Sequence, residues 1–208
     1  MSEYKLYGFG QSGHSYKVAL MLELLGVDWT LEKIDFFKGE TRSDEYRSNV
    51  NEMGEAPVLV ADGEKMTQSG VILDYLADKH GKFGGQTAAE KREIWRWILY
   101  DNHKVSSQVG GYRFMIGIKK MAENDVTKFL KSKYSDALSV MNKHLDGQDF
   151  FVANRPTIAD FSLCSYLFFA DEFGETFEDY PNIQRWLNNI KALKGWQHPY
   201  DLMPKAEL

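Results

Sequence analysis

The sequence is poor in cysteine, with Cys164 as the single thiol among 208 residues. An intrachain disulfide needs two cysteines, so a disulfide framework and dithiol redox chemistry within one chain are both excluded. Any second thiol that takes part in this protein's chemistry must therefore belong to another molecule. Cys164 itself lies in the apolar run DFSLCSYLFFA, where we expect an inert core thiol.

Other absences exclude classes of partner. No uninterrupted apolar run approaches the roughly 20 residues that cross a bilayer, and the segment Met1–Lys5 lacks the basic and then apolar pattern of a signal peptide. The 25 Lys and Arg are scattered and outnumbered by 30 Asp and Glu, which gives a formal charge of -5. This balance provides no electrostatic footprint for nucleic acid or an anionic membrane. We expect a cytoplasmic protein that binds neither, and no metal cofactor.

The chain does contain enough apolar residues, 43% of the total, to bury a substantial core. The first ~80 residues alternate between strand and helix patterns. The predicted order is β-α-β-α-β-β-α, which favours a small mixed sheet covered by helices. The segments are strands at 5–9, 29–36, 56–60 and 65–67, and helices at 18–25, 43–49 and from Ser69 onward. Gly26 is placed to end the first helix.

A glycine-rich break, HGKFGGQT, separates this region from one in which nearly every segment has helical periodicity. Helices are predicted at 88–109, 125–145, 157–173 and 182–193. We therefore expect an α/β domain at 1–80, a linker at 81–87 and an all-α domain at 88–208.

The stretch GQSGHSYKV places two hydroxyls, Ser12 and Ser15, where dithiol redox proteins have their paired cysteines. A strand that leads into a helix N-terminus collects backbone N–H groups that favour negative charge. A hydroxyl held there can donate a hydrogen bond to a thiolate and lower the pKa of a bound thiol. The alternative is that both serines are turn and cap residues.

Two further motifs lie at the ends of predicted elements. In EAPV, a cis bond before Pro57 would turn the backbone of Ala56 outward, where it could pair with an extended peptide ligand; an ordinary trans proline is the alternative. Gln68 and Ser69 lie between a strand and a helix N-terminus, which could bind a carboxylate. The alternative is that Ser69 merely caps its helix.

The three motifs follow one another as in the glutathione S-transferase family, whose thioredoxin-like domain the first ~85 residues resemble. Leu6–Gly26 is similar to the bacterial pattern LYGFxxSGNSYKVxLxLxLLG, with His14 in place of Asn. EAPVLV and QSGVILDYLA resemble the family's cis-proline and γ-glutamyl-binding segments. NRPTIAD resembles the capping box of its C-terminal domain, with Thr157 and Asp160 at the required spacing.

The resemblance implies a transferase that conjugates the glutathione thiolate to small hydrophobic electrophiles. It implies that the hydroxyl of Ser12 stabilises this thiolate, with Ser15 as the second choice for that role. The backbone of Ala56, with Pro57, would pair with the cysteinyl part of glutathione, and Gln68 and Ser69 would hold its γ-glutamyl end. The hydroxyls thus replace a nucleophilic cysteine because the sulfur arrives with the ligand.

The resemblance also implies roles outside these motifs. Lys38 could meet the glycyl carboxylate, although a solvated lysine is the default. Asp101 could reach the γ-glutamyl ammonium in a partner subunit, which implies a homodimer, or be one more exposed acid. Tyr7 could contact the substrate or simply pack in its strand. The electrophile pocket would be formed by Tyr100, His103 and Ser107, with Tyr112 and Phe114 as further candidates, although such clusters are more often core.

The sequence departs from the family pattern NPxGxVP at NEMGEAP, where Glu55 stands beside the path of the ligand. The negative charge of Glu55 could repel the carboxylates of glutathione and so weaken its binding. The family often has an acidic residue where this chain has Gln68, and the neutral Gln68 partly compensates for the charge of Glu55. Two rival functions share the same site residues. One is glutathione-dependent reduction of peroxides or disulfides, or isomerisation, and the other is a non-catalytic binding protein. The presence of Ser12 and Ser69 favours an enzyme.

Overall fold

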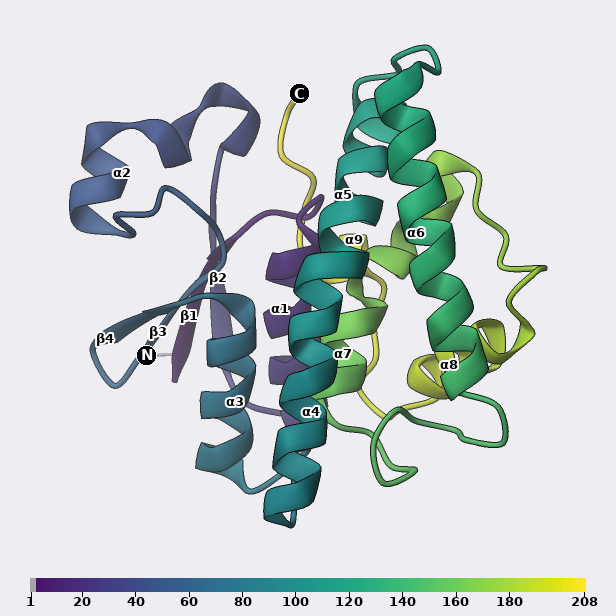
Figure 1. Cartoon of the computed structure of the whole chain (residues 1–208). Coiled ribbons are helices and arrows are strands. Elements are labelled where there is room, and N and C mark those ends of the chain that lie inside the picture. Colours follow the sequence, from purple (N-terminus) through teal and green to yellow (C-terminus); the bar gives the residue numbers. More distant parts are fainter. Residues whose placement is uncertain (1–2) are drawn as a thin grey trace. The chain divides into compact units, whose positions relative to one another are not determined.

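The computed structural model describes residues 3–208 and divides the chain into two compact units (Figure 1). Met1 and Ser2, part of the N-terminal segment considered above, lie outside the described residues. The first unit runs to Lys82 and also contains Lys194–Leu208, and the second is Phe83–Leu193. Residues 194–208, which the sequence analysis placed in the all-α domain, thus group with the first unit.

The first unit contains a four-stranded mixed sheet with the strand order β2-β1-β3-β4. The strands are β1 (Tyr4–Gly8), β2 (Trp29–Lys33), β3 (Val58–Ala61) and β4 (Glu64–Thr67). β1 pairs with β2 in parallel, Leu6 opposite Leu31, and with β3 in antiparallel, Leu6 opposite Leu59. Tyr4, Leu6 and Gly8 of β1 are buried, while Lys5 is exposed, as expected when alternate side chains point to opposite faces.

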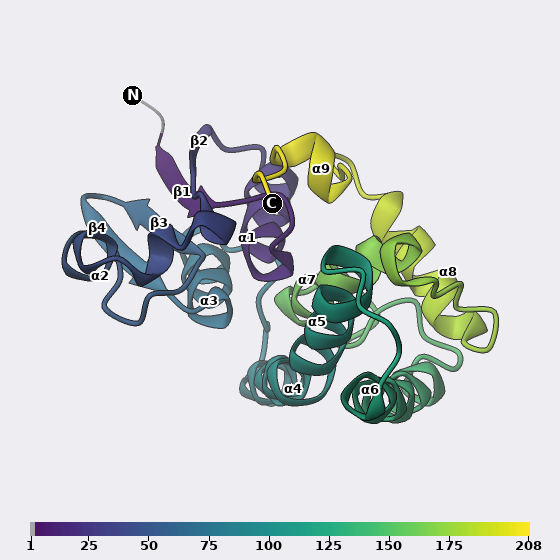
Figure 2. The ribbon, with the colours of Figure 1, turned by 90° about the horizontal axis from the view of Figure 1, so that it is seen from above.

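The helices of the first unit begin and end at residues that suit those positions. They are α1 (Gly13–Leu25), α2 (Asp44–Asn49), α3 (Ser69–His80) and α9 (Pro199–Leu202), with short 3-10 turns at Phe36–Lys38 and Glu40–Arg42. Gly26 ends α1 in the left-handed conformation, φ 71°, which confirms its predicted role. α1 packs against β1, α3 and α9, and Figure 2 shows α9 beside α1.

The regular elements of the second unit are all helices, as predicted, apart from an isolated β-bridge between Val152 and Arg155. Its elements are α4 (Ala88–Tyr100), the π-helical η3 (Asp101–Ser106), α5 (Ser107–Arg113), the π-helical η4 (Phe114–Ile118), α6 (Asp125–His144), α7 (Ile158–Cys164), the 3-10 helical η5 (Ser165–Phe173) and α8 (Pro181–Lys191). The helix predicted at 88–109 thus continues to Ile118 through two wider π turns. Between residues 3 and 208, none of the helices has the combination of length and apolar character that a bilayer-spanning helix requires.

The core of the second unit is organised around the capping box predicted at the start of α7. The fully buried carboxylate of Asp160 accepts hydrogen bonds from the Thr157 N–H at 2.8 Å and the Thr157 hydroxyl at 2.9 Å. It also accepts from the Phe151 N–H and the Trp186 indole N–H, both at 2.9 Å. Burial raises the pKa of Asp160, and these hydrogen bonds oppose that shift. Cys164, at the end of the same helix, is fully buried, as predicted.

Candidate functional site

Ser12 is the residue that caps α1. Its Oγ accepts a hydrogen bond from the Ser15 N–H at 3.0 Å, and only 7% of its surface is exposed. An oxygen that accepts from the helix leaves its own hydrogen free to be donated elsewhere. The hydroxyl can therefore stabilise an anion in front of α1, where the helix dipole also favours negative charge.

Ser15 occupies a different environment from the one the sequence suggested. It is neither the cap of α1 nor directed at the space before the helix. Its fully buried hydroxyl faces the end of β1: a Cβ atom placed on Gly8 would lie only 2.8 Å from Ser15 Oγ. Within residues 3–208 that hydroxyl has no hydrogen-bond partner. We therefore assign Ser15 to the close packing of α1 on β1 and not to catalysis.

The N-termini of α1 and α3 lie side by side. Ser69 Oγ and His14 Nδ1 are 3.4 Å apart, which joins the first turn of one helix to the first residue of the other. Burial, aided by the charge of Lys17, lowers the pKa of His14 from 6.5 to about 3, so its imidazole is neutral at physiological pH. Two sets of helix N–H groups and a neutral donor or acceptor thus converge at one place, an arrangement suited to an anionic ligand.

Ser69 itself is the first residue of α3 and not its cap, so the predicted capping role was wrong. The cap position belongs to Gln68, which has the positive φ of 65° that is rare for residues with a side chain. Such conformations cost about 1–3 kcal/mol and cluster at ligand-binding positions. Because Ser69 does not cap α3, its hydroxyl, which is 5% exposed, is available to a partner outside its own helix.

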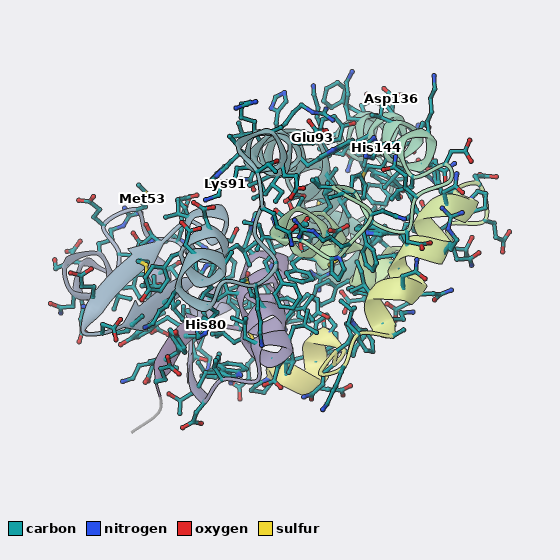
Figure 3. The ribbon with its side chains drawn as sticks, turned by 90° about the horizontal axis from the view of Figure 1, so that it is seen from below. Met53, His80, Lys91, Glu93, Asp136 and His144 are labelled. Carbon is teal, nitrogen blue, oxygen red and sulfur yellow. The ribbon has the colours of Figure 1, made fainter. Side chains whose placement is uncertain are left out.

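The predicted compensation between Gln68 and Glu55 has a direct structural basis. Gln68 Nε2 donates to Glu55 Oε2 at 3.0 Å and lies 3.5 Å from the sulfur of Met53, which is labelled in Figure 3. The amide therefore supplies a hydrogen-bond donor to the carboxylate of Glu55. A carboxylate at position 68 would instead repel Glu55.

The bond between Ala56 and Pro57 is cis, as the motif suggested. Sheet pairing of β3 begins only at Val58, so the backbone of Ala56 stands outside the ladder. The preceding carbonyl, of Glu55, accepts hydrogen bonds from the Tyr46 hydroxyl at 3.0 Å and Asn51 Nδ2 at 2.9 Å. Burial raises the pKa of Tyr46 to about 12, which keeps this phenol a donor. The segment is thus fixed from one side and its peptide groups can pair with an extended ligand.

Lys38 is exposed and already has a carboxylate partner. Its Nζ lies 2.8 Å from Glu207 and 3.7 Å from Asp35, and the hydrogen bond to Glu207 raises its pKa. The lysine is therefore positively charged and can exchange this partner for another carboxylate.

Asp101 does not fit the role predicted for it. Its carboxylate is fully buried and accepts hydrogen bonds from the Ser106 hydroxyl at 2.8 Å and the Ser162 hydroxyl at 2.6 Å. Both partners belong to its own unit, so the residue is neither an exposed acid nor one that reaches a ligand in a partner subunit. Asp101 is the first residue of the π-helical stretch η3.

The predicted pocket residues fall into two groups. Tyr7 packs against the cluster of Phe9, Ile34, Tyr46 and Ala206, and Tyr100 donates to the Ala137 carbonyl at 3.4 Å, so both have structural roles. His103 and Ser107 are exposed on one helical stretch, joined by a hydrogen bond from the Ser107 hydroxyl to the His103 carbonyl at 2.8 Å. Tyr112 is buried, and Phe114 is 39% exposed. His103 and Ser107 remain the candidates for contacting a second substrate.

Sequence reasoning missed two features of the site. One is the contact of His14 with Ser69, which the departure from Asn at position 14 could have signalled. The other is Gln11, whose partners lie at the far end of the chain. No local pattern marks a pair of residues separated by 195 positions. In the part of the chain that the structure covers, no group of three or more His, Cys, Asp or Glu side chains could hold a metal ion.

The mixed sheet, the cis-proline and the two converging helix N-termini define a thioredoxin-like domain, which here accompanies a helical one. Models of the N-terminal and C-terminal domains of glutathione S-transferases match residues 6–86 and 112–194. The chain belongs to the glutathione S-transferase family.

Individual relatives agree with this assignment. Glutathione S-transferase D7 from Drosophila melanogaster is 26% identical over 213 residues, covering 100% of this chain and 93% of the relative. Maleylacetoacetate isomerase from Pseudomonas aeruginosa is 25% identical over 189 residues, and the match covers 87% of this chain and 88% of the isomerase. The crystal structure of a possible glutathione S-transferase from Rhodopseudomonas palustris is 29% identical, with a TM-score of 0.85 over 95% of this chain and 98% of the other.

Proposed function

We propose that the protein is a glutathione transferase that joins the glutathione thiolate to small hydrophobic electrophiles. The observation that carries the proposal is the hydroxyl of Ser12, whose oxygen accepts from the α1 backbone and whose hydrogen is free to be donated to a thiolate. A charge-assisted hydrogen bond of about 1.5–3 kcal/mol corresponds to one or two units of thiol pKa. The pKa of free glutathione's thiol, about 8.5 by analogy with cysteine, would then fall to near neutrality.

The tripeptide is proposed to extend from α1 across the cis-proline segment to α3. Its cysteinyl part would pair with the backbone of Ala56, beside Pro57. Its γ-glutamyl carboxylate would lie at the N-terminus of α3, near the Ser69 hydroxyl and the amide of Gln68. Lys38 would hold the glycyl carboxylate as a point charge in place of Glu207.

The proposed reaction needs no covalent enzyme intermediate. The thiol proton leaves to solvent, and the thiolate sulfur forms a new bond to an electrophilic carbon. In a displacement the leaving group departs with its electron pair, and in an addition the pair moves onto the acceptor, which is then protonated. Ser12 stabilises the thiolate, which lowers the barrier because more of the bound glutathione is ionised at a given pH.

A calorimetric titration with reduced glutathione, followed by product analysis, tests this proposal. We expect heat of binding and a thioether product with halo-aromatic substrates. Because one relative bears the name of an isomerase, a cis-trans isomerisation assay is run in parallel with assays on peroxides and mixed disulfides. If products form only in one of those assays, the protein catalyses that reaction and not conjugation. If glutathione binds and no assay yields a product, the protein is non-catalytic.

We further propose that the protein is a homodimer in the cytoplasm, as family membership suggests. Sedimentation equilibrium gives the mass in solution, which should be twice 24.0 kDa. A mass of one chain across the micromolar range would contradict the dimer. Because Asp101 is buried within its own unit, the site of each chain should not depend on this residue of the partner.

A further inference from the structure

The chain segment 203–208 crosses the loop that leads into Ser12. The Gly10 N–H donates to the Pro204 carbonyl at 3.0 Å. The side-chain amide of Gln11 forms two hydrogen bonds with the backbone of Ala206: Nε2 donates to its carbonyl and Oε1 accepts from its N–H, both at 2.8 Å. Gln11 and Ala206 are 7% and 3% exposed, so this pairing is shielded from water. In Figures 1 and 2 the yellow segment that leads to the C-terminus passes beside the purple segment before α1.

The loop and the segment fit each other closely. A Cβ atom on Gly10 would lie 2.5 Å from the Met203 carbonyl oxygen and 2.8 Å from that of Pro204, so only glycine allows the segment to pass. The Ala206 methyl packs in the cluster with Phe9, the residue before Gly10. The contact therefore involves packing, backbone pairing and side-chain pairing at once.

The segment holds the residues that determine where Ser12 points. The Ser12 N–H donates to the Phe9 carbonyl at 3.0 Å, which closes a β-turn with Gly10 and Gln11 as its two central residues. Both central residues are bound from outside, one by Pro204 and the other by Ala206. The orientation of the turn, and with it the Ser12 hydroxyl, is thus fixed by contacts with residues near the other end of the sequence.

We propose that Gln11 is a positioning residue and that, with the segment 203–208, it forms a clamp that aligns the Ser12 hydroxyl with the thiolate of bound glutathione. The inference rests on the proposed function of Ser12. Displacements of about 1 Å at a reacting group are enough to lower rates a hundredfold. Loosening the clamp should therefore lower turnover and raise the pKa of the bound thiol without preventing glutathione from binding elsewhere along its length.

The test compares Gln11→Leu, a variant truncated after Lys205, and the combination of both. The control is truncation after Glu207, which removes only the exposed Leu208 and leaves every contact of the clamp. The readouts are kcat, the calorimetric Kd for glutathione and the pH midpoint of thiolate formation, followed by ultraviolet absorbance of the complex. In all three variants we expect about a tenfold loss of kcat and a midpoint raised by about one pH unit. The Kd should change by less than about threefold in Gln11→Leu. The truncated variants also lose Glu207, the partner of Lys38, so they should bind glutathione up to about fivefold more tightly.

The combined variant tests whether the two changes act on one interaction. If the clamp works through Gln11 and Ala206, the combined variant is no worse than the poorer single one, whereas independent effects multiply. Ala206→Gly separates packing from pairing, because it keeps both backbone groups and removes the methyl. It should lower the melting temperature and keep the thiolate midpoint of the parent.

The outcomes distinguish the clamp from the function it serves. A parent protein that binds no glutathione, or that leaves the thiol pKa unchanged, overturns the proposed function together with the clamp. If the parent lowers the thiol pKa, and Gln11→Leu and the truncated variant lower it equally well, the clamp alone is overturned. Multiplying losses in the combined variant, or a shifted midpoint in Ala206→Gly, would also contradict it.

Discussion

Ser12 combines two functions that a suitable substitution can separate. Its oxygen caps α1, and its hydrogen is proposed to bind the thiolate. Ser12→Ala removes both and should lower the free energy of unfolding by about 1 kcal/mol through loss of the cap. Ser12→Asp keeps an acceptor for the Ser15 N–H and retains the cap, but it supplies no hydrogen at neutral pH and adds a negative charge.

The expected rise in the thiol pKa, and the loss of kcat that results, follow from the strength of the hydrogen bond that is lost. Removing a charge-assisted bond of about 1.5–3 kcal/mol raises the pKa of the bound thiol by about one to two units, at 1.36 kcal/mol per unit. At pH 7 the return of the thiol pKa from about 7.5 or 6.5 to about 8.5 lowers the fraction of thiolate, and therefore kcat, by about 8- to 25-fold. The added charge of aspartate increases this loss, whereas stability changes little.

The assay is kcat against pH for the parent, Ser12→Asp, Ser12→Ala and the control Ser139→Asp, which adds the same charge to an exposed serine of α6. The rising limb of the Ser12 variants should move upward by one unit or more, while that of the control should not move. In urea unfolding, Ser12→Asp should have nearly the same free energy of unfolding as the parent, because aspartate retains the cap of α1. An unshifted limb in both Ser12 variants would refute the assignment and leave activation to other groups.

Three further predictions concern residues around this site and in the helical unit. Glu207→Gln should release Lys38 from its nearer carboxylate, leaving Asp35 at 3.7 Å, and lower the KM for glutathione by up to about fivefold at low salt, with kcat unchanged; an unchanged KM would exclude Lys38 as the carboxylate partner. Because the pKa of His14 is about 3 when folded and 6.5 when unfolded, the unfolded chain binds the extra proton, so stability should fall as pH decreases from about 6.5 towards 3. His14→Asn should flatten this part of the pH profile of unfolding, and equal slopes in both proteins would contradict the shift. Asp160→Ala leaves four buried donor groups without their acceptor and should destabilise the protein by about 3 kcal/mol or more in denaturant unfolding; a loss below about 1 kcal/mol would show that the network contributes little.

The sequence by itself determined the features whose causes are local. Hydrophobic periodicity placed the strands and most helices, Gly26 ended α1, and the spacing of Thr157 and Asp160 identified a capping box. The order of the motifs identified the family. These predictions succeeded because each depends on residues within a few positions of one another, where side-chain period, backbone conformation and capping are the deciding factors.

The tertiary structure decided the different environments of two nearby hydroxyls. The sequence offered Ser12 as the first choice and Ser15 as the second, and only the fold shows the Ser15 hydroxyl packed against Gly8. Likewise, only the fold shows that Asp101 is enclosed by two serines and that Gln11 meets Ala206. These contacts join residues up to 195 positions apart, and no local preference encodes them. They follow from burying one surface against another, a property of the whole chain.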